Sequence, residues 1–167
     1  DFTEASINYR QALKLNIAIV SQQQIAINYM NMGLNYLGAD SVNKGLSYFL
    51  VSLIIADSLN MENEKLALMK NIGYTYARMG KNEEALSHFY KVLELLGERP
   101  DDLTRSDAQL NIAKGYYQMK NYPAALKYAL LSFDLSRSRH FNNIYRDAAG
   151  LLSDIYAARG DYRQAYS

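Results

Sequence analysis

Residues 71–96 read NIGYTYARMGKNEEALSHFYKVLELL, and the apolar residues in and just before this stretch follow the period of about 3.6 residues that marks half-buried helices. The first stripe consists of Met69, Ile72, Gly73 and Tyr76, and the second of Ala85, Phe89, Val92, Leu93 and Leu96. Between them lie Gly80, which tolerates the left-handed conformation that ends many helices, and Asn82, a favourable N-cap. The stretch therefore predicts a hairpin of two antiparallel helices.

The same pattern returns every 40 residues without a gap. In the first helix of each hairpin the equivalent residues are Met32, Ile72, Ile112 and Leu152; Gly33, Gly73, Ala113 and Ser153; and Tyr36, Tyr76, Tyr116 and Tyr156. In the second helix they are Ala5, Gly45, Ala85, Ala125 and Ala165; Tyr9, Phe49, Phe89 and Ala129; and Leu13, Leu53, Leu93 and Phe133. A fixed period of roughly 20–50 residues is typical of a solenoid. Its small residues allow two helices to approach, and its large ones fill the space beside them.

The repeats predict an all-α fold, a right-handed α-α superhelix built from antiparallel helix hairpins, with no competing strand pattern. We expect a single array over residues 1–167. Its parts are the second helix of a truncated repeat (1–20), three full repeats (23–58, 63–96 and 103–137) and a partial last repeat (142–167). The expected turns include Gly97 to Asp101, with Asp101 or Asp102 as the next N-cap, and Pro123 is expected in the first turn of its helix.

Composition narrows the function classes. The 18 basic and 17 acidic residues give a net charge of +1, which offers no support for a nucleic-acid surface. The absence of cysteine excludes disulfides and thiolate metal sites. No apolar run is long enough to span a membrane, so we expect no direct membrane insertion. The compartment stays open, since either a cytoplasmic or an extracytoplasmic domain of a larger chain would fit.

The repeat resembles the tetratricopeptide repeat family. Its small–x–x–Tyr signature matches Gly73 and Tyr76, and its Ala-x-x-x-Phe-x-x-Val signature matches Ala85, Phe89 and Val92. The commonest version of the family repeats every ~34 residues, so the additional residues here lengthen either the helices or the turns. The long period, with LSDIYAARGDYRQAYS at residues 152–167, is similar to the sensory arrays of bacterial signalling proteins.

In this family the first helices of successive hairpins line a concave, ligand-binding groove. Carried over by position, the candidate groove residues are Met30, Asn31, Leu34, Lys70, Asn71, Tyr74, Arg78, Asn111, Lys114 and Tyr117. Further groove positions are Ile27, Leu37, Asp107, Leu110, Asp147, Leu151 and Asp154. We expect the asparagines to bind a peptide backbone, the cations to meet an acidic group, and the tyrosines to give rigid contact area.

Two structural explanations compete with this groove. Asparagine is common at its repeat position throughout the family, and the apolar set (Ile27, Met30, Leu34 and Leu37) can equally pack against a preceding helix. The carboxylate clamp of chaperone-binding members is also a poor match, because only Asn71 fits in one register and only Lys70 and Asn111 in the other. We therefore do not expect recognition of a chaperone tail.

Catalysis and cofactor binding have no pattern to support them. The two histidines, His88 and His140, are far apart in the sequence, and neither has metal-ligand spacing to another candidate ligand. We expect no enzyme activity, cofactor or metal in this chain. The expected function is protein or peptide binding, as the regulatory or sensory part of a larger signalling protein. The alternative is a constitutive scaffold or adaptor, and the array ends could also self-associate.

Overall fold

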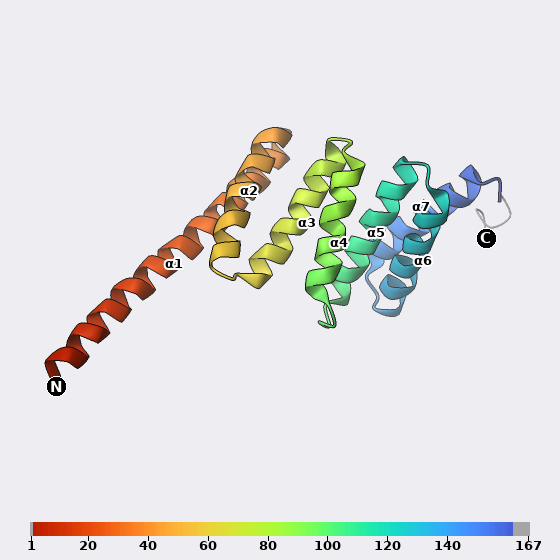
Figure 1. Ribbon diagram of the computed structural model, residues 1–167. Helices are drawn as coiled ribbons and strands as arrows, with labels where there is room; N and C mark the ends of the chain where they lie inside the picture. Colours follow the sequence, from red (N-terminus) through yellow and green to blue (C-terminus); the bar gives the residue numbers. More distant parts are fainter. Residues whose placement is uncertain (1, 162–167) are drawn as a thin grey trace. The chain divides into compact units, whose positions relative to one another are not determined.

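The structure, a computed structural model, describes the backbone of residues 2–161 and the side chains of residues 18–161. This part of the chain is all-α, with helices that pack in sequential antiparallel pairs like those of a tetratricopeptide-type solenoid (Figure 1). The helices are α1 (Phe2–Gly38), α2 (Val42–Ser58), α3 (Glu62–Arg78), α4 (Asn82–Leu96), α5 (Asp102–Gln118), α6 (Tyr122–Ser138) and α7 (Asn142–Ala158). Among these described helices, none combines the length and apolarity that crossing a membrane requires.

The chain divides into two compact units, and the boundary lies inside α3. Unit 1 is Asp1–Leu68 and unit 2 is Met69–Ser167. In unit 1, α1 packs on α2; in unit 2, α5 packs on α4, α6 and α7, and α6 also packs on α7. Each unit contains at least one hairpin of the predicted kind and is described separately below.

Six of the described turns follow a twenty-residue spacing, and one residue in each of them adopts a positive φ; in the turn between α4 and α5 that residue is Gly97. The six residues are Asp40, Asn60, Gly80, Lys120, His140 and Gly160, with φ between 53° and 83°. In the first turn the Ser41 amide donates to the Tyr36 carbonyl at 2.9 Å, and the Asp40 amide to the Leu37 carbonyl at 3.3 Å, which is a Schellman motif. The helices from α2 to α7 are 15 or 17 residues long. The residues beyond the common repeat length therefore lengthen the helices.

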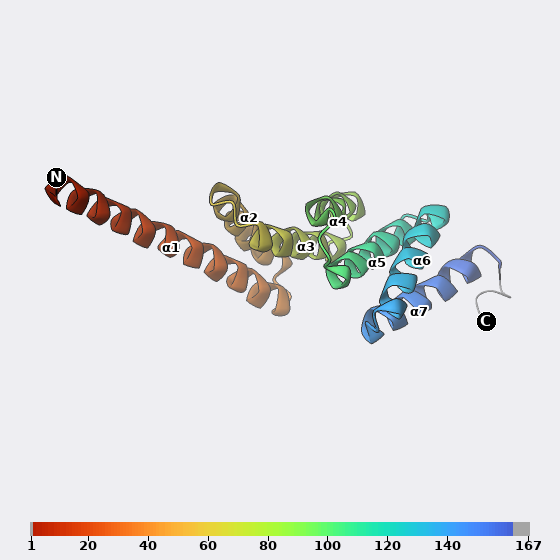
Figure 2. The same ribbon diagram turned by 90° about the horizontal axis from the view of Figure 1, so that it is seen from below.

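The predicted break between a helix ending at residue 20 and another starting at residue 23 is wrong. A single helix of 37 residues, α1, runs through this place (Figures 1 and 2). Val20 occupies the position that has a positive φ in six of the described turns, and a β-branched residue strongly disfavours that conformation. The surrounding residues 17–21 contain neither glycine nor proline. With nothing to end it, the helix continues.

The local predictions of helix starts have mixed outcomes. Asp101 is confirmed as the N-cap of α5, where its carboxylate accepts a hydrogen bond from the Thr104 amide at 3.0 Å. Pro123 lies in the first turn of α6, as predicted. Asn82 is not an N-cap, because α4 already begins there and Lys81 takes the N-cap position without a side-chain bond. The last helix expected after Asp161 lies outside the described residues.

The core of each hairpin is built on the small and large residues of the repeat. A Cβ atom added at Gly33 would lie 2.5 Å from the Phe49 ring, and one added at Gly73 would lie 3.0 Å from the Phe89 ring. Both rings are buried. In the third repeat Ala129, also buried, takes the place of the ring, and Phe133 packs one turn further along α6. Glycine is thus needed where the aromatic ring lies directly on the backbone.

Candidate functional site

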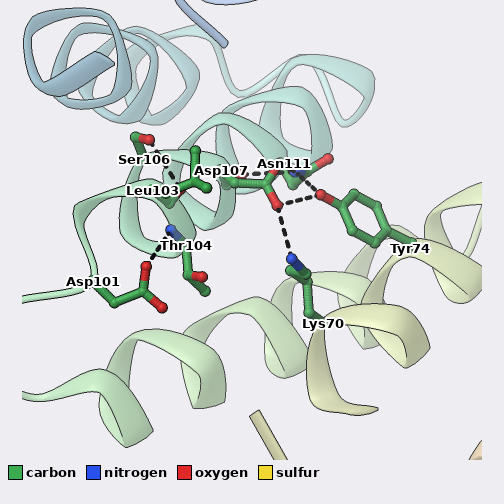
Figure 3. A network of polar contacts seen from close by, with 8 residues as sticks. All are labelled: Lys70, Tyr74, Asp101, Leu103, Thr104, Ser106, Asp107 and Asn111. Atoms are coloured by element: carbon green, nitrogen blue, oxygen red, sulfur yellow. Dashed lines mark hydrogen bonds and ion pairs between the residues drawn. The ribbon is translucent and has the colours of Figure 1, made fainter. Parts of the chain in front are cut away.

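Four side chains of α3 and α5 meet in unit 2 around one carboxylate, and we name them the Asp107 centre: Lys70, Tyr74, Asp107 and Asn111 (Figure 3). The Tyr74 hydroxyl donates to Asp107 Oδ2 at 2.5 Å, and Lys70 Nζ lies 3.7 Å from the same oxygen. The Asn111 amide nitrogen donates to Asp107 Oδ1 at 3.2 Å, to the Asp107 carbonyl at 2.7 Å and to the Tyr74 hydroxyl at 3.2 Å. These contacts fix each side chain through at least one of the others.

The sequence places this centre through helical spacing. Lys70 and Tyr74 are four residues apart on α3, and Asp107 and Asn111 are four apart on α5, so each pair shares one face of its helix. The start of α5 is held by the Asp101 cap and by Arg105, whose guanidinium donates to the Gly97 carbonyl at 2.6 Å. The register of α5 therefore positions both of its polar side chains toward α3.

The electrostatics of the centre favour a neutral tyrosine beside a charged pair. Burial, followed by the negative charge of Asp107, raises the pKa of Tyr74 above its ordinary value. The hydroxyl thus keeps its proton and donates a hydrogen bond to Asp107. The side chains of Lys70 and Asp107 are 32% and 21% exposed. Lys70 is thus already paired with a carboxylate of the protein in this structure.

Lys114 has a similar partner one repeat further along. Its Nζ lies 3.3 Å from Asp147 Oδ2 on α7, and the two side chains are 46% and 50% exposed. Lys114 is the repeat equivalent of Tyr74, and Asp147 is the equivalent of Asp107. The same pair of positions therefore carries a hydrogen bond between α3 and α5 and an ion pair between α5 and α7. Since the second pair is largely exposed, water and salt compete with it.

A pocket of about 260 Å³ opens next to these residues in unit 2. It is lined by Ala77, Gly80, Asn82, Ala85, Asn111, Lys114, Gly115 and Gln118. Two of the sequence-predicted residues, Asn111 and Lys114, line it together with Gln118. Its lining offers one cation and three carboxamides among small residues, a combination able to hold a polar side chain or a carboxylate.

The remaining predicted residues lie elsewhere. Tyr117 packs on Tyr122, with ring centroids 5.9 Å apart, and against the core shared by α5, α6 and α7. Asn71 is half-buried on α3, and its carbonyl accepts from the Thr75 hydroxyl at 2.7 Å. Arg78 is exposed near the end of α3. Met30, Asn31 and Leu34 belong to α1 of unit 1, where Leu34 is 43% exposed.

Asp107 is the residue whose role the sequence did not reveal. Its position indicated only that it belongs to the groove, whereas in the structure it accepts contacts from all three other residues of the centre. The signal that could have found it is its spacing, four residues before Asn111 and 33 residues after Tyr74. The 33-residue spacing recurs between Lys114 and Asp147.

The histidines take structural places. The His88 ring packs on Tyr76, with centroids 5.3 Å apart, and its Nδ1 lies 2.9 Å from the Glu84 carbonyl. His140 is the residue that adopts a positive φ in the turn before α7. Over the residues that the structure describes, no group of three or more His, Cys, Asp or Glu side chains could hold a metal ion.

Residues 66–98 match the family model of the tetratricopeptide repeat, which identifies one such repeat in α3 and α4. No curated protein sequence matches the chain. Repeats of this kind form extended surfaces that typically bind protein segments. A tetratricopeptide repeat is not catalytic in itself.

Solved structures share the fold. The apo form of RapI matches with a TM-score of 0.79 and 16% identity, over 87% of this chain and 40% of RapI. The TPR domain of Arabidopsis FLU gives 0.67 and 22%, over 70% of this chain and 98% of that domain. A signal transduction ATPase with numerous domains from Pyrococcus horikoshii, which has a tetratricopeptide repeat sensor, gives 0.72 and 20%, over 77% of this chain and 20% of that protein. The chain thus spans less than half of two of these proteins.

Proposed function

We propose that unit 2 binds a segment of another protein next to Lys114, in the pocket that Asn111 and Gln118 also line. The observation that carries this proposal is the contrast between the two groove lysines. Lys70 is held inside the Asp107 centre, whereas Lys114 is 46% exposed and borders the pocket. An exposed ion pair contributes only about 0–1 kcal/mol, so a ligand carboxylate can replace Asp147 beside Lys114 at little cost.

The Asp107 centre has a different part in this proposal. Its hydrogen bonds hold Asn111 in one orientation at the edge of the pocket. A side chain that is already ordered loses little conformational entropy when a ligand binds, and such preorganisation favours affinity. The ligand expected here is an extended peptide with an acidic side chain for Lys114 and a polar group for Gln118.

Selection from a library of random peptides tests this site, followed by calorimetric measurement of affinity. We expect Lys114→Ala to weaken binding of a selected peptide by about tenfold, the equivalent of roughly 1.4 kcal/mol. Lys91→Ala, which removes an exposed lysine from α4, is the matched control and should leave the affinity unchanged. If the two variants bind equally well, the ligand does not use this pocket. Lys114 is preferred over Lys70 because a change at Lys70 also disturbs Asp107.

We further propose that this binding serves regulation, as the sensory part of a larger signalling protein. The similarity in fold to a STAND protein with a tetratricopeptide repeat sensor supports this role. The alternative is a constitutive scaffold or adaptor. A sensor must change its conformational equilibrium when the ligand binds, and this requires different affinities for two states, whereas a scaffold need not change.

Fluorescence transfer between one label in each unit distinguishes the two roles. The chain has no cysteine, so two introduced cysteines can be labelled without removing native ones. A sensor predicts a change in transfer when a selected peptide saturates the pocket. Unchanged transfer at saturation would favour the scaffold. The Lys114→Ala variant, which binds the peptide weakly, provides the control for effects of the peptide on the dyes.

A further inference from the structure

Among the described residues of unit 1, no helix covers one apolar face. A pocket of about 490 Å³ lies on α1 and α2, lined by Ile25, Asn28, Tyr29, Met32 and Tyr48, and we call this lining the α1 face. Ile25 is 44% exposed and Met32 is 39% exposed. Tyr29 and Tyr48 stack with centroids 5.9 Å apart, so part of the face is a rigid aromatic surface.

The equivalent face in unit 2 is covered by a helix. Eighty residues further along, its equivalents are Arg105, Ala108, Gln109, Ile112 and Tyr128 of α5 and α6. There α4 packs on α5, and both Ala108 and Ile112 are fully buried. Leu86 and Phe89 of α4 join Ile112 in one core cluster, and the Tyr90 ring meets the Tyr128 ring edge-on at 5.8 Å. The α1 face is thus the equivalent of a surface that is covered in unit 2 by α4, the second helix of a hairpin.

The chain contains the equivalent of that covering helix. Residues 2–16 correspond to α4, with Ala5 in place of Ala85, Tyr9 in place of Phe89 and Leu13 in place of Leu93. In unit 2 the turn at 97–101 lets α4 fold back onto α5, but residues 17–21 are helical. Residues 2–16 are therefore collinear with the helix that bears the α1 face. At about 1.5 Å per residue, residues 6 and 35 of one helix are separated by roughly 40 Å.

We propose that residues 2–16 of a second copy of this chain cover the α1 face, in a symmetric antiparallel pair of α1 helices. Each copy would then supply the covering helix that the other one needs. This is a domain-swapped arrangement, which forms between two copies the contacts that α4 and α5 form within one. It is independent of the peptide site in unit 2.

The register of this pair follows from unit 2. A Cβ atom added at Gly115 would lie 3.0 Å from Leu86 Cδ2. The equivalent positions in α1 are Ser6 and Asn35, and the point midway between them is at Val20 and Ser21. A two-fold axis near Ser21 places position 6 of one helix opposite position 35 of the other, and position 13 opposite position 28, in both directions. The small, exposed side chain of Ser21 allows two helices to approach closely there.

The charge pattern of α1 favours a covered α1 face. Residues 15–39 contain no Asp, Glu, Lys, Arg or His, so this part of the helix brings no formal charge into an interface. Unpaired charges are costly to bury, whereas the uncharged amides of this segment can form hydrogen bonds across a helix pair. A helix whose surface is meant only for water usually carries charged residues on its outer face.

Sedimentation of the full chain over a range of concentrations tests the pair. We expect a mass of two chains, and we expect Ser21→Glu to raise the dissociation constant by about 100-fold or more, because it places two like charges at the two-fold axis. The control is Ile54→Glu on α2, a residue 71% exposed, which should leave the dissociation constant unchanged. A chain that sediments as one copy at all concentrations, or a dimer insensitive to Ser21→Glu, would overturn the proposal.

Disulfide formation identifies the occupant directly, since the chain has no native cysteine. A mixture of a Ser6→Cys chain with an Asn35→Cys chain should give a covalent heterodimer after mild oxidation. In the double variant, a bond within one chain would show instead that α1 bends and residues 2–16 cover their own face. That result, or the absence of any bond in the mixture, contradicts the exchange between copies.

Discussion

Residues 2–58 and residues 82–138 are the same structural element, 80 residues apart, yet they fold differently at one place. In the second copy a turn at 97–101 separates α4 from α5, and it contains Gly97, with φ of 46°, and Pro100. In the first copy the equivalent residues 17–21 continue α1 as a helix. The difference teaches that a repeat pattern identifies helices and their faces, whereas a few turn residues decide which helices can fold back on each other.

Other features of the two copies are preserved. Tyr36 stacks on Tyr48 at 5.2 Å between centroids, and Tyr116 stacks on its equivalent partner, Tyr128, at 6.1 Å. The packing of α1 on α2 is therefore the same as the packing of α5 on α6. What differs is the surface on the outer side, where Met32 is 39% exposed and its equivalent Ile112 is fully buried.

The largest change in stability is expected when the aromatic packing on Gly33 is removed, a packing that unit 1 has and the third repeat lacks. Phe49→Ala should lower the free energy of unfolding by about 3–5 kcal/mol, because it leaves a cavity over Gly33. Gly33→Ala alone should cost about 1–3 kcal/mol by overpacking. Denaturant unfolding of the single and double variants forms a mutant cycle.

The mutant cycle predicts that Gly33→Ala changes from destabilising to stabilising when Phe49 is replaced by alanine. In the Phe49→Ala background, Gly33→Ala should recover up to about 1 kcal/mol, since it improves helix propensity and fills part of the cavity. This combination reproduces the buried pair Ala113 and Ala129 of the third repeat. Additive costs would contradict the view that glycine is required by the ring alone.

A second prediction concerns the turn at residues 97–101, which has no counterpart in the continuous helix at residues 17–21. Gly97→Ala should lower the free energy of unfolding by about 1–3 kcal/mol, because φ of 46° with ψ of −124° is strained for any residue with a Cβ atom. Gly150→Ala, inside α7 and with open space around the added carbon, is the control. It should stabilise the protein by about 0.8–1 kcal/mol. Thermal unfolding measures both; equal effects of the same sign would refute the strain.

A smaller effect tests whether the preserved contacts are energetically equivalent. Ser52 donates to the Ala26 carbonyl at 2.7 Å in unit 1, and Ser132 donates to the Ser106 carbonyl at 2.8 Å in unit 2. Both serines are buried. Each alanine substitution should cost about 0.5–1.5 kcal/mol, and the two costs should agree. The exposed Ser138→Ala is the control. Unequal losses would mean that the two units differ beyond their connections.

The smallest effect concerns the ion pair between Lys114 and Asp147, since the equivalent positions in unit 1, Leu34 and Ala67, carry no charge. Asp147→Asn should change the free energy of unfolding by less than about 1 kcal/mol, and the change should fade in high salt. Denaturant unfolding at low and high salt measures it. A larger, salt-independent loss would show that the pair is structural, and Lys114 would then be a poor candidate for ligand binding.

The residues that could be predicted are those whose role depends on their own helix or turn. Ile72 and Phe89 follow from helical period, and Asp101 follows from the chemistry of helix N-caps. Asp107 could not be predicted as the common acceptor, because two of its three partners, Lys70 and Tyr74, come from another helix. The continuity of α1 could have been predicted from Val20, which disfavours the positive φ of a turn, but the repeat pattern favoured a turn at this place.

The sequence by itself determined that the chain is all-α, how its helices are spaced, and which side of each helix is buried. These properties depend on interactions within about one helical turn and on small and large residues that recur at fixed intervals. Only the tertiary structure decided that Lys70 is paired with Asp107, that Lys114 borders a pocket, and that no described helix of unit 1 covers the α1 face. Such features depend on the register between different helices. That register comes from turn geometry and packing, and no periodicity of a single helix encodes it.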